Sequence, residues 1–188
     1  MGQVQKIIDG TGIKNGDKII GLTSNGLHSN GYSLARKVLL EIHNLDLNKT
    51  YEGLNDRLFE ELLRPTKIYV KPVIDVLDNF SIKGMAHITG SGLPGNIKRI
   101  IPDGLTAKID LTGHTVPSIF KFIMELGNVP IEEMYSTFNM GIGFVIIVDK
   151  NDATSAIQMF NEHGENAFEI GSIQMSSDGE KVQIDYRL

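Results

Sequence analysis

The spacing of hydrophobic residues predicts a strand, a polar loop and a helix near the start of the chain. Asp17–Leu22 reads as a strand and leads into a loop of Thr, Ser, Asn and Gly at residues 23–30. The apolar residues that follow recur at helical spacing, at Leu34, Ala35, Val38 and Ile42. Because the first backbone N–H groups of a helix need acceptors, we expect Ser29 or Asn30 to cap this helix.

The same two periodicities continue along the chain. Further strands are expected at Met85–Thr89, Leu105–Leu111, Gly143–Val148, Ala167–Ile173 and Lys181–Tyr186. Helical patterns cover residues 55–63, Val70–Phe80, Ile97–Ile101, Pro117–Leu126, Ile131–Thr137 and Asp152–His163. Strands and helices follow one another in mixed order without a linker or repeat, which indicates a single α+β domain over residues 1–188, a mixed β-sheet layered with α-helices.

Two of these segments carry additional information. Gly143–Val148 contains no polar alternation, so we expect a central strand that is covered on both faces. Ser177-Asp178-Gly179 is a turn signal that joins the last two strands.

Composition narrows the class of protein. The 188 residues are 41% hydrophobic and carry a formal net charge of −5, with 18 scattered Lys and Arg residues, which argues against a nucleic-acid partner. No cysteine is present, so disulfides and thiolate sites are excluded and a cytoplasmic location is expected. The longest apolar run is far shorter than the ~20 residues that cross a bilayer, so no membrane partner is expected.

Several common catalytic signatures are missing. The chain has no G-x-x-x-x-G-K-[ST] phosphate loop, no H-E-x-x-H zinc helix and no G-x-S-x-G nucleophile elbow. The histidines show no pairing at i,i+2 or i,i+4, so no metal site is predicted. His43 and His163 fall at expected helix ends, where contact with the helix dipole explains them.

A glycine-rich run, Gly90-Ser91-Gly92-Leu93-Pro94-Gly95-Asn96, follows one of the expected strands. It matches G-x-G-x-x-G, with Asp110 about 20 residues further on, as in dinucleotide sites. However, the space before Pro102 is too short for the crossover helix of such a site. Two interpretations remain: a tight turn made by glycines, or a phosphate cradle of backbone N–H groups.

The loop at residues 23–31 is the second candidate site. Its polar side chains and imidazole lie between a strand and a helix start, at Ser24, Asn25, His28, Ser29 and Asn30. Such a loop can bind an anionic, hydroxyl-rich ligand, or it can be a capping loop without a ligand. His28 is the one group there that transfers a proton near neutral pH, although it can equally serve as a hydrogen-bonding contact.

Three segments together resemble the aminoimidazole ribonucleotide synthetase family: LTSNGLHSNGYSL at Leu22–Leu34, GMAHITGSGLPGN at Gly84–Asn96 and EEMYSTFNMGIG at Glu132–Gly143. The resemblance covers nearly the whole chain and implies the carboxy-terminal domain of a two-domain enzyme. In that family, formylglycinamidine ribonucleotide and ATP give aminoimidazole ribonucleotide, ADP and phosphate. The formyl or amide oxygen is phosphorylated and leaves as phosphate while a nitrogen closes the ring.

The resemblance also implies partners and site residues. ATP and Mg²⁺ are managed mainly by an amino-terminal domain that this chain does not contain, the full-length enzyme is a homodimer, and this half is inactive alone. Substrate contacts are implied for Ser24, Asn25, His28, Ser29 and Asn30, with His28 as the catalytic candidate. Phosphate or nucleotide contacts are implied for Gly90, Ser91, Gly92, Gly95, Asn96, Asn139 and Gly141.

Two positions depart from simple expectation. The family commonly has three glycines where this chain has Gly90-Ser91-Gly92, which questions whether Ser91 adopts a positive φ angle. By strand alternation, His87 is expected to be buried and structural.

Two other functions stay open. The chain can be a non-catalytic module that binds a phosphorylated metabolite, or part of a paralogous ATP-dependent synthetase or kinase of the same superfamily.

Overall fold

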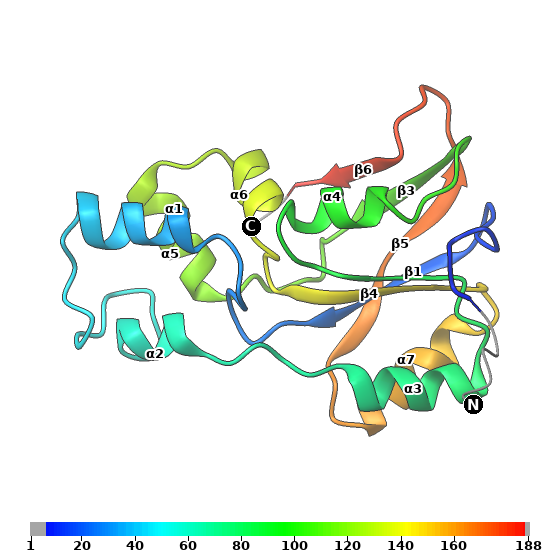
Figure 1. Ribbon diagram of the computed structural model, residues 1–188, viewed down its shortest axis with the longest axis horizontal. Helices are drawn as coiled ribbons and strands as arrows, with labels where there is room; N and C mark the ends of the chain where they lie inside the picture. The colour runs from blue at the N-terminus through cyan, green and yellow to red at the C-terminus, as the bar shows by residue number, and fades with distance from the viewer. Residues whose placement is uncertain (1–6, 187–188) are drawn as a thin grey trace.

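A computed structural model describes residues 7–186 and contains one six-stranded sheet with helices around it (Figure 1). The strands are β1 (Lys18–Thr23), β2 (Gly84–His87), β3 (Leu105–Asp110), β4 (Ile142–Val148), β5 (Ala167–Met175) and β6 (Val182–Asp185). Their order across the sheet is β2-β4-β1-β5-β3-β6. The predicted α+β fold with a mixed sheet is confirmed.

The first strand of the chain occupies the middle of the sheet. β1 pairs in antiparallel fashion with β4 on one side and with β5 on the other. β3 pairs antiparallel with β5 and parallel with β6, which makes the sheet mixed. All residues of β4 except Phe144 are buried, so the prediction of a strand covered on both faces is confirmed.

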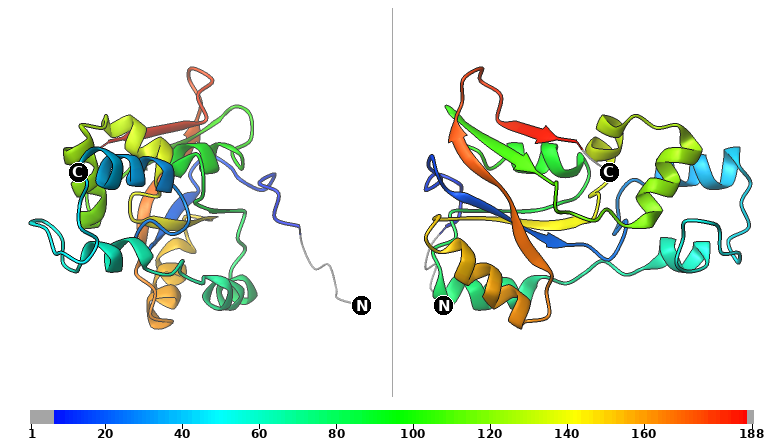
Figure 2. Two further views of the ribbon diagram at one scale, coloured as in Figure 1. Left: turned by 60° about the vertical axis from the view of Figure 1, so that its left-hand side comes forward. Right: turned by 180° about the vertical axis from the view of Figure 1, so that it is seen from behind.

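Helices enclose the sheet from two sides. They are α1 (Tyr32–Arg36), α2 (Leu58–Leu63), α3 (Val70–Asn79), α4 (Gly92–Lys98), α5 (Ser118–Gly127), α6 (Ile131–Thr137) and α7 (Ala153–Glu162). α3 and α7 lie side by side along one face, whereas α4 and α6 lie above the other (Figures 1 and 2). Within residues 7–186, no helix has the length and apolar character needed to cross a membrane.

Alternation along β1 divides the core into two clusters. Ile20 packs in the cluster that includes α3 and α7, whereas Ile19 packs in the larger cluster under the remaining helices. Both side chains are fully buried. The period-two pattern of this strand therefore supports a helical layer on each face.

Two local features differ from expectation. The helix predicted over Leu34–Ile42 begins as α1 at Tyr32 and continues as a π-helix, η1, over Lys37–Ile42. The turn at Ser177-Asp178-Gly179 joins β5 to β6, but the two strands do not form a hairpin because β3 lies between them.

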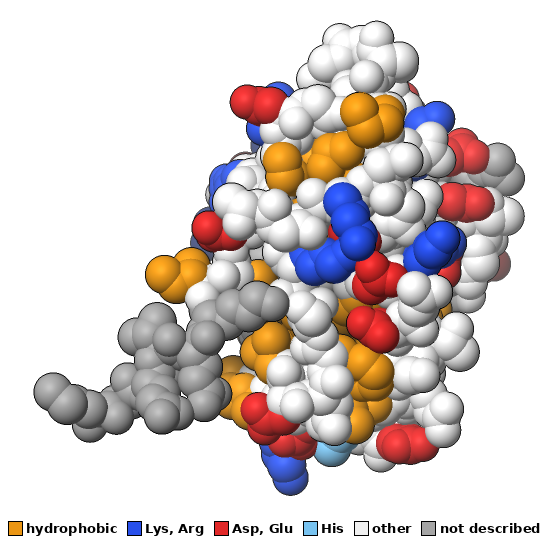
Figure 3. Space-filling model, turned by 90° about the vertical axis from the view of Figure 1, so that its right-hand side faces the viewer, with side chains coloured by type: hydrophobic (Ala, Val, Ile, Leu, Met, Phe, Trp, Pro, Cys, Tyr) orange, Lys and Arg blue, Asp and Glu red, His pale blue; other side chains and the backbone are white. Residues whose placement is uncertain are grey.

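Some large hydrophobic side chains remain at the surface. Those with high exposure include Ile68, Val70, Ile74, Met85 and Met175. Figure 3 looks at the molecule from one end and shows hydrophobic side chains between charged ones on that surface.

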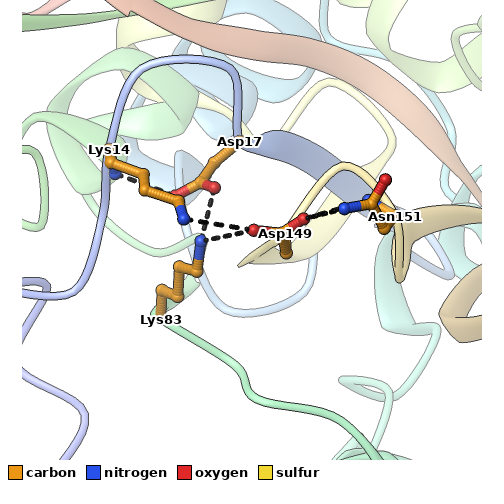
Figure 4. A network of polar contacts seen from close by, with 5 residues as sticks. All are labelled: Lys14, Asp17, Lys83, Asp149 and Asn151. Atoms are coloured by element: carbon orange, nitrogen blue, oxygen red, sulfur yellow. Dashed lines mark hydrogen bonds and ion pairs between the residues drawn. The ribbon is translucent and has the colours of Figure 1, made fainter.

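A network of charged groups ties the sheet together at the end where β1 begins (Figure 4). The Lys83 ammonium lies 2.5 Å from Asp17 Oδ1 and 3.3 Å from Asp149 Oδ2. Burial lowers the pKa of Lys83, but its hydrogen bonds to Asp17 and Asp149 outweigh this effect and raise it. Hydrogen bonds from the Asn151 backbone and from Lys83 lower the pKa of Asp149 to about 2. Lys83 and Asp149 therefore stay charged at neutral pH.

Candidate functional site

Hydrogen bonds join the Ser24–Gly31 loop to residues 139–141 where β1 ends and β4 begins. The Ser24 backbone N–H donates to the Gly141 carbonyl at 2.8 Å, and the Ser24 hydroxyl donates to Asn139 Oδ1 at 2.9 Å. Asn139 Nδ2 donates to the Gly26 carbonyl at 2.8 Å. The loop at Ser24–Gly31 is therefore fixed by residues more than a hundred positions later in the chain.

Asn139 is a structural support of this loop. Its side chain is buried, and besides Ser24 its Oδ1 accepts a hydrogen bond from the Gly141 backbone at 2.8 Å. Both ends of the amide therefore bond within the chain. The phosphate contacts predicted for Asn139 and Gly141 stay predictions, and the geometry assigns both residues to holding the loop.

The glycine-rich run forms the start of a helix. α4 begins at Gly92, whereas a helical turn was predicted only from Ile97, and Pro94 lies in its first turn. A proline in the first turn costs no hydrogen bond, because the first N–H groups of a helix have no partner within it. Ser91 adopts the left-handed conformation with φ 81°, so the missing glycine does not prevent a positive φ there.

Asn96 stabilises this helix start from inside. It is buried, and its Nδ2 donates to the carbonyls of Thr89, Gly90 and Gly92 at 3.2, 3.2 and 2.7 Å. The backbone N–H of Gly92 donates to Thr89, and that of Gly95 donates to Ser91. These donors already have acceptors within the chain. Gly90 and Ser91 are the exposed residues of the run.

The run is not a dinucleotide-binding unit. β2, which precedes it, lies at one edge of the sheet, and the next strand, β3, lies near the opposite edge. A dinucleotide site needs two parallel neighbouring strands joined by a crossover helix. The sheet topology therefore confirms what the short space before Pro102 predicts.

The glycine-rich run approaches the first loop. A side chain at Gly90 would lie 3.8 Å from Asn30 Oδ1. The structure thus brings three predicted segments to one end of the sheet, although they are distant in sequence. Asn25, Ser29 and Gly90 are exposed there, and Asn30 is half-buried.

The predicted side-chain cap of the first helix is wrong. Gly31 occupies the N-cap position of α1 with φ 78° and no side-chain cap is present. A side chain at Gly31 would come within 2.1 Å of the Phe138 ring, so the close packing of loop and ring requires glycine here. Ser29 instead shares a hydrogen bond of 3.2 Å with the Thr66 hydroxyl.

His28 is buried beneath the loop with φ 56°. Its Nε2 accepts the backbone N–H of Asn25 at 3.1 Å and that of Lys67 at 3.4 Å. The ring proton therefore resides on Nδ1, which is buried without a partner among the described residues. Burial, followed by the charges of His87 and Lys67, lowers the pKa of His28 to about 4. The imidazole is neutral at physiological pH.

A group of rings surrounds His28. The ring centres of His28 and Tyr69 are 6.2 Å apart, and His87 lies 6.4 Å from His28. His87 is exposed, so the expectation that it is buried is wrong. It shares with Met85 the face of edge strand β2 that helix α3 leaves partly uncovered.

Sequence reasoning missed the segment Pro65–Tyr69, which supports the site loop. It contacts the loop through Pro65, whose carbonyl accepts from Asn25 Nδ2 at 3.4 Å, and through Thr66 and Lys67. Tyr69 donates its hydroxyl to the Thr23 carbonyl at 2.8 Å. Its position in a proline-fixed connection between two helices is a signal, because such connections often carry binding residues.

The Lys67 ammonium is paired with a carboxylate. Its ammonium lies 2.7 Å from Glu165 Oε2 and 5.8 Å from the centre of the Tyr69 ring. Within residues 7–186, no group of three or more His, Asp or Glu side chains is arranged to hold a metal ion.

The free energy of unfolding is expected to depend on His28 between pH 7 and about 4. The unfolded imidazole takes up a proton near pH 6.5, whereas the folded one stays neutral until about pH 4. The unfolded state binds more protons in this range, so the contribution is fully present above pH 6.5 and is lost as the pH falls, by up to about 3 kcal/mol. Urea denaturation as a function of pH measures this loss.

The matched variants separate His28 from other groups. His28→Asn is expected to remove this part of the pH dependence, whereas replacing exposed His43 with Gln should retain it. A His28→Asn protein that keeps the full pH dependence would contradict the assignment.

Comparison with known proteins adds family information. Residues 14–183 match the family model described as "AIR synthase related protein, C-terminal domain". A phosphoribosylformylglycinamidine cyclo-ligase of Syntrophus aciditrophicus is 46% identical over 96% of this chain, which covers 52% of that relative. One of Bacillus pumilus is 51% identical over 93% of this chain, which covers 51% of it. The chain thus spans about half the length of these relatives.

A solved structure supports the fold. The thiamine-monophosphate kinase of Stenotrophomonas maltophilia superposes with a TM-score of 0.60 at 16% identity. The alignment covers 93% of this chain and 52% of the kinase chain. At this identity the likeness concerns the fold alone. Because the family model spans most of the sequence, the chain belongs to the AIR synthase related protein family and represents its C-terminal domain.

Proposed function

We propose that this chain supplies the substrate-side half of a phosphoribosylformylglycinamidine cyclo-ligase. The proposed reaction converts formylglycinamidine ribonucleotide and ATP to aminoimidazole ribonucleotide, ADP and phosphate, a step of purine biosynthesis. The observation that carries the proposal is the identity of 46% and 51% to relatives of that name over nearly the whole chain. A cytoplasmic location and a homodimeric full-length enzyme stay predictions.

Substrate contact is proposed for the accessible polar side chains of the first loop. Asn25 and Ser29 are exposed and Asn30 is half-buried, so their amide and hydroxyl groups can meet a hydroxyl-rich, phosphorylated ligand. Ser24 shapes the loop through its bonds to Asn139 and Gly141. The loop is thereby preorganised, which lowers the entropic cost of binding.

For His28 the contacts favour a positioning role over proton transfer. Its Nε2 already accepts two backbone N–H groups, and it holds the first loop against the segment that contains Lys67. With a pKa near 4, the ring is not a source of protons at neutral pH. We therefore propose that it supports the substrate contacts of its neighbours.

ATP and Mg²⁺ are proposed to bind mainly through the other half of the enzyme. In this half, exposed Gly90 and Ser91 are the parts of the glycine-rich run that remain accessible to a phosphate group. Gly92, Gly95 and Asn96 donate to the carbonyls of Thr89, Ser91 and Gly92 respectively, so we assign them to the shape of the run. The described residues offer no metal-binding cluster, and no step is assigned to magnesium here.

Fusion of the amino-terminal half of the Bacillus pumilus relative to this chain tests the proposal. The fused protein is expected to form ADP and aminoimidazole ribonucleotide from formylglycinamidine ribonucleotide and ATP, whereas this chain alone forms neither. A folded fusion that makes no product would contradict the proposal. ADP formation only with a different acceptor would assign the chain to a paralogous kinase or synthetase.

Variants of the fusion test the loop itself. Asn30→Ala is expected to lower kcat/KM by about tenfold or more, because one hydrogen bond to the substrate is lost. Asn48→Ala, at an exposed asparagine of another loop, should leave kcat/KM unchanged. Equal activities of the two variants would remove Asn30 from the substrate site.

A further inference from the structure

An apolar groove lies open between helix α3 and edge strand β2. It has a volume of about 340 Å³, and its lining includes Ile68, Val70, Ile74, Met85 and Phe144. Ile68 is 78% exposed, Val70 63% and Ile74 50%. Contiguous exposed apolar surface of this kind marks an interaction site in soluble proteins.

Helix α3 is apolar on two sides. Val73 and Val76 are buried in the core against the sheet. Val70 and Ile74, one turn apart, form a second stripe that faces the groove. A surface helix normally presents polar residues on the side away from its core. Val70 and Ile74 remain 63% and 50% exposed, so the described residues leave this second stripe largely uncovered.

The groove carries little charge. Lys67 and His87 are the lining residues whose side chains can carry a positive charge, and none of the lining residues is acidic. The Lys67 ammonium is already paired with Glu165 at 2.7 Å. A partner surface that covers the groove must therefore be largely apolar.

β2 adds a second incomplete feature at the same place. It is the outermost strand on its side of the sheet and pairs only with β4 among the described strands. Gly84–His87 contains no Lys or Pro to protect this edge from pairing. A partner that covers the groove would lie alongside this strand edge as well.

The path of the chain indicates which partner is available. The family model describes a C-terminal domain, and this chain covers about half of its relatives, so their remaining half precedes the matched region. Ile8 lies against α3, where it lines a hollow together with Ile74 and Leu77. Both of these α3 residues also line the groove. Figure 3 shows hydrophobic side chains at this end of the surface.

We propose that the apolar face of α3 and β2 docks the amino-terminal half that its relatives possess. This inference rests on the proposed function, because it assumes a parent protein of the relatives' length. A preceding domain would be tethered beside the groove at an effective concentration on the order of millimolar, which favours this partner over a second copy.

Docking at this face would also complete the candidate site. His87 lines the groove, and its ring centre is 6.1 Å from that of Tyr69 and 6.4 Å from that of His28. The incoming domain would cover the ring cluster that supports the Ser24–Gly31 loop. Residues of both halves of the enzyme would then line the candidate site beside His28.

Thiol labelling provides a direct test, because the chain contains no cysteine. The Ile74→Cys thiol is expected to react readily in this chain alone. When the amino-terminal half of the Bacillus pumilus relative is fused to the chain, the labelling rate is expected to fall by at least about tenfold. Met175→Cys is the matched control, since Met175 is 66% exposed and lies outside the groove on β5. Its labelling rate should not change, and mass spectrometry identifies the labelled residue.

Three results would overturn the proposal. The first is an Ile74→Cys thiol that reacts equally fast in the fused and the isolated chain. The second is concentration-dependent protection in the isolated chain, which would assign the face to a second copy. The third is protection that appears only with added ATP, which would make the groove a ligand pocket.

The labelling result is independent of turnover. Protection without product formation would leave the docking face intact and reject the proposed reaction. Product formation without protection would support the proposed reaction and reject the docking face.

Discussion

Gly92→Ala is expected to lower the free energy of unfolding by about 3–5 kcal/mol, which places it among the most damaging single substitutions. A Cβ atom at this position would lie 1.9 Å from the Tyr135 carbonyl oxygen and 2.9 Å from that of Phe138. Both oxygens belong to the backbone of helix α6 or its C-cap, so neither can move without disturbing that helix. The left-handed φ of 58° adds strain of roughly 1–2 kcal/mol.

Gly104→Ala is the matched control for Gly92→Ala. Gly104 also has a positive φ, of 81°, but nothing lies within 4 Å of the position that its Cβ would take. Its cost should be limited to backbone strain of roughly 1–2 kcal/mol. Urea denaturation midpoints compare the two variants, and equal losses of stability would show that close packing at Gly92 is unimportant.

Lys83→Met is expected to cost about 3–5 kcal/mol, because it leaves the Asp17 carboxylate buried without its counter-ion. Asp17 is only 1% exposed, and the Lys83 ammonium lies 2.5 Å from its Oδ1. The other oxygen of Asp17 accepts the Lys14 backbone N–H at 2.8 Å, which does not neutralise the charge. Thermal or urea denaturation at neutral pH measures the effect.

Two further variants test the reason for this loss. Lys18→Met breaks an ion pair with Glu169 in which the side chains are 32% and 43% exposed, so its cost should be about 0.2–1 kcal/mol. Adding Asp17→Asn to Lys83→Met removes the buried charge and should recover most of the stability. A double variant as unstable as Lys83→Met would indicate that packing of the lysine stem, rather than charge, is responsible.

Regular elements were predictable wherever burial imposes a period. The unbroken apolar run Gly143–Val148 identified β4, and the pattern over Val70–Phe80 identified α3. The π-helical turn at Lys37–Ile42 was not predicted, because one wider turn scarcely alters the spacing of buried residues. The predicted start of α4 was too late in the chain. Glycines often end helices, but here Gly92 begins a helix because it allows close packing against the backbone of α6.

The candidate site was predictable only in part. The polar loop and the glycine-rich run stood out by composition, but the bond from Ser24 to Asn139 spans 115 positions and has no local signature. Alternation along β2 separates its residues into two faces without indicating which face is covered. His87 was therefore assigned to the wrong environment, and its proximity to His28 appeared only in the folded chain.

The central position of β1 affects how this protein folds during its synthesis. β1 is synthesised before the other strands of the sheet, yet its partners β4 and β5 come much later, as the ion pair between Lys18 and Glu169, 151 positions apart, illustrates. At ~5–20 residues per second, translation leaves both edges of this apolar strand unpaired for on the order of ten seconds. Nascent chains are therefore expected to need a chaperone until β5 is made, and translational stalling before that point should promote aggregation.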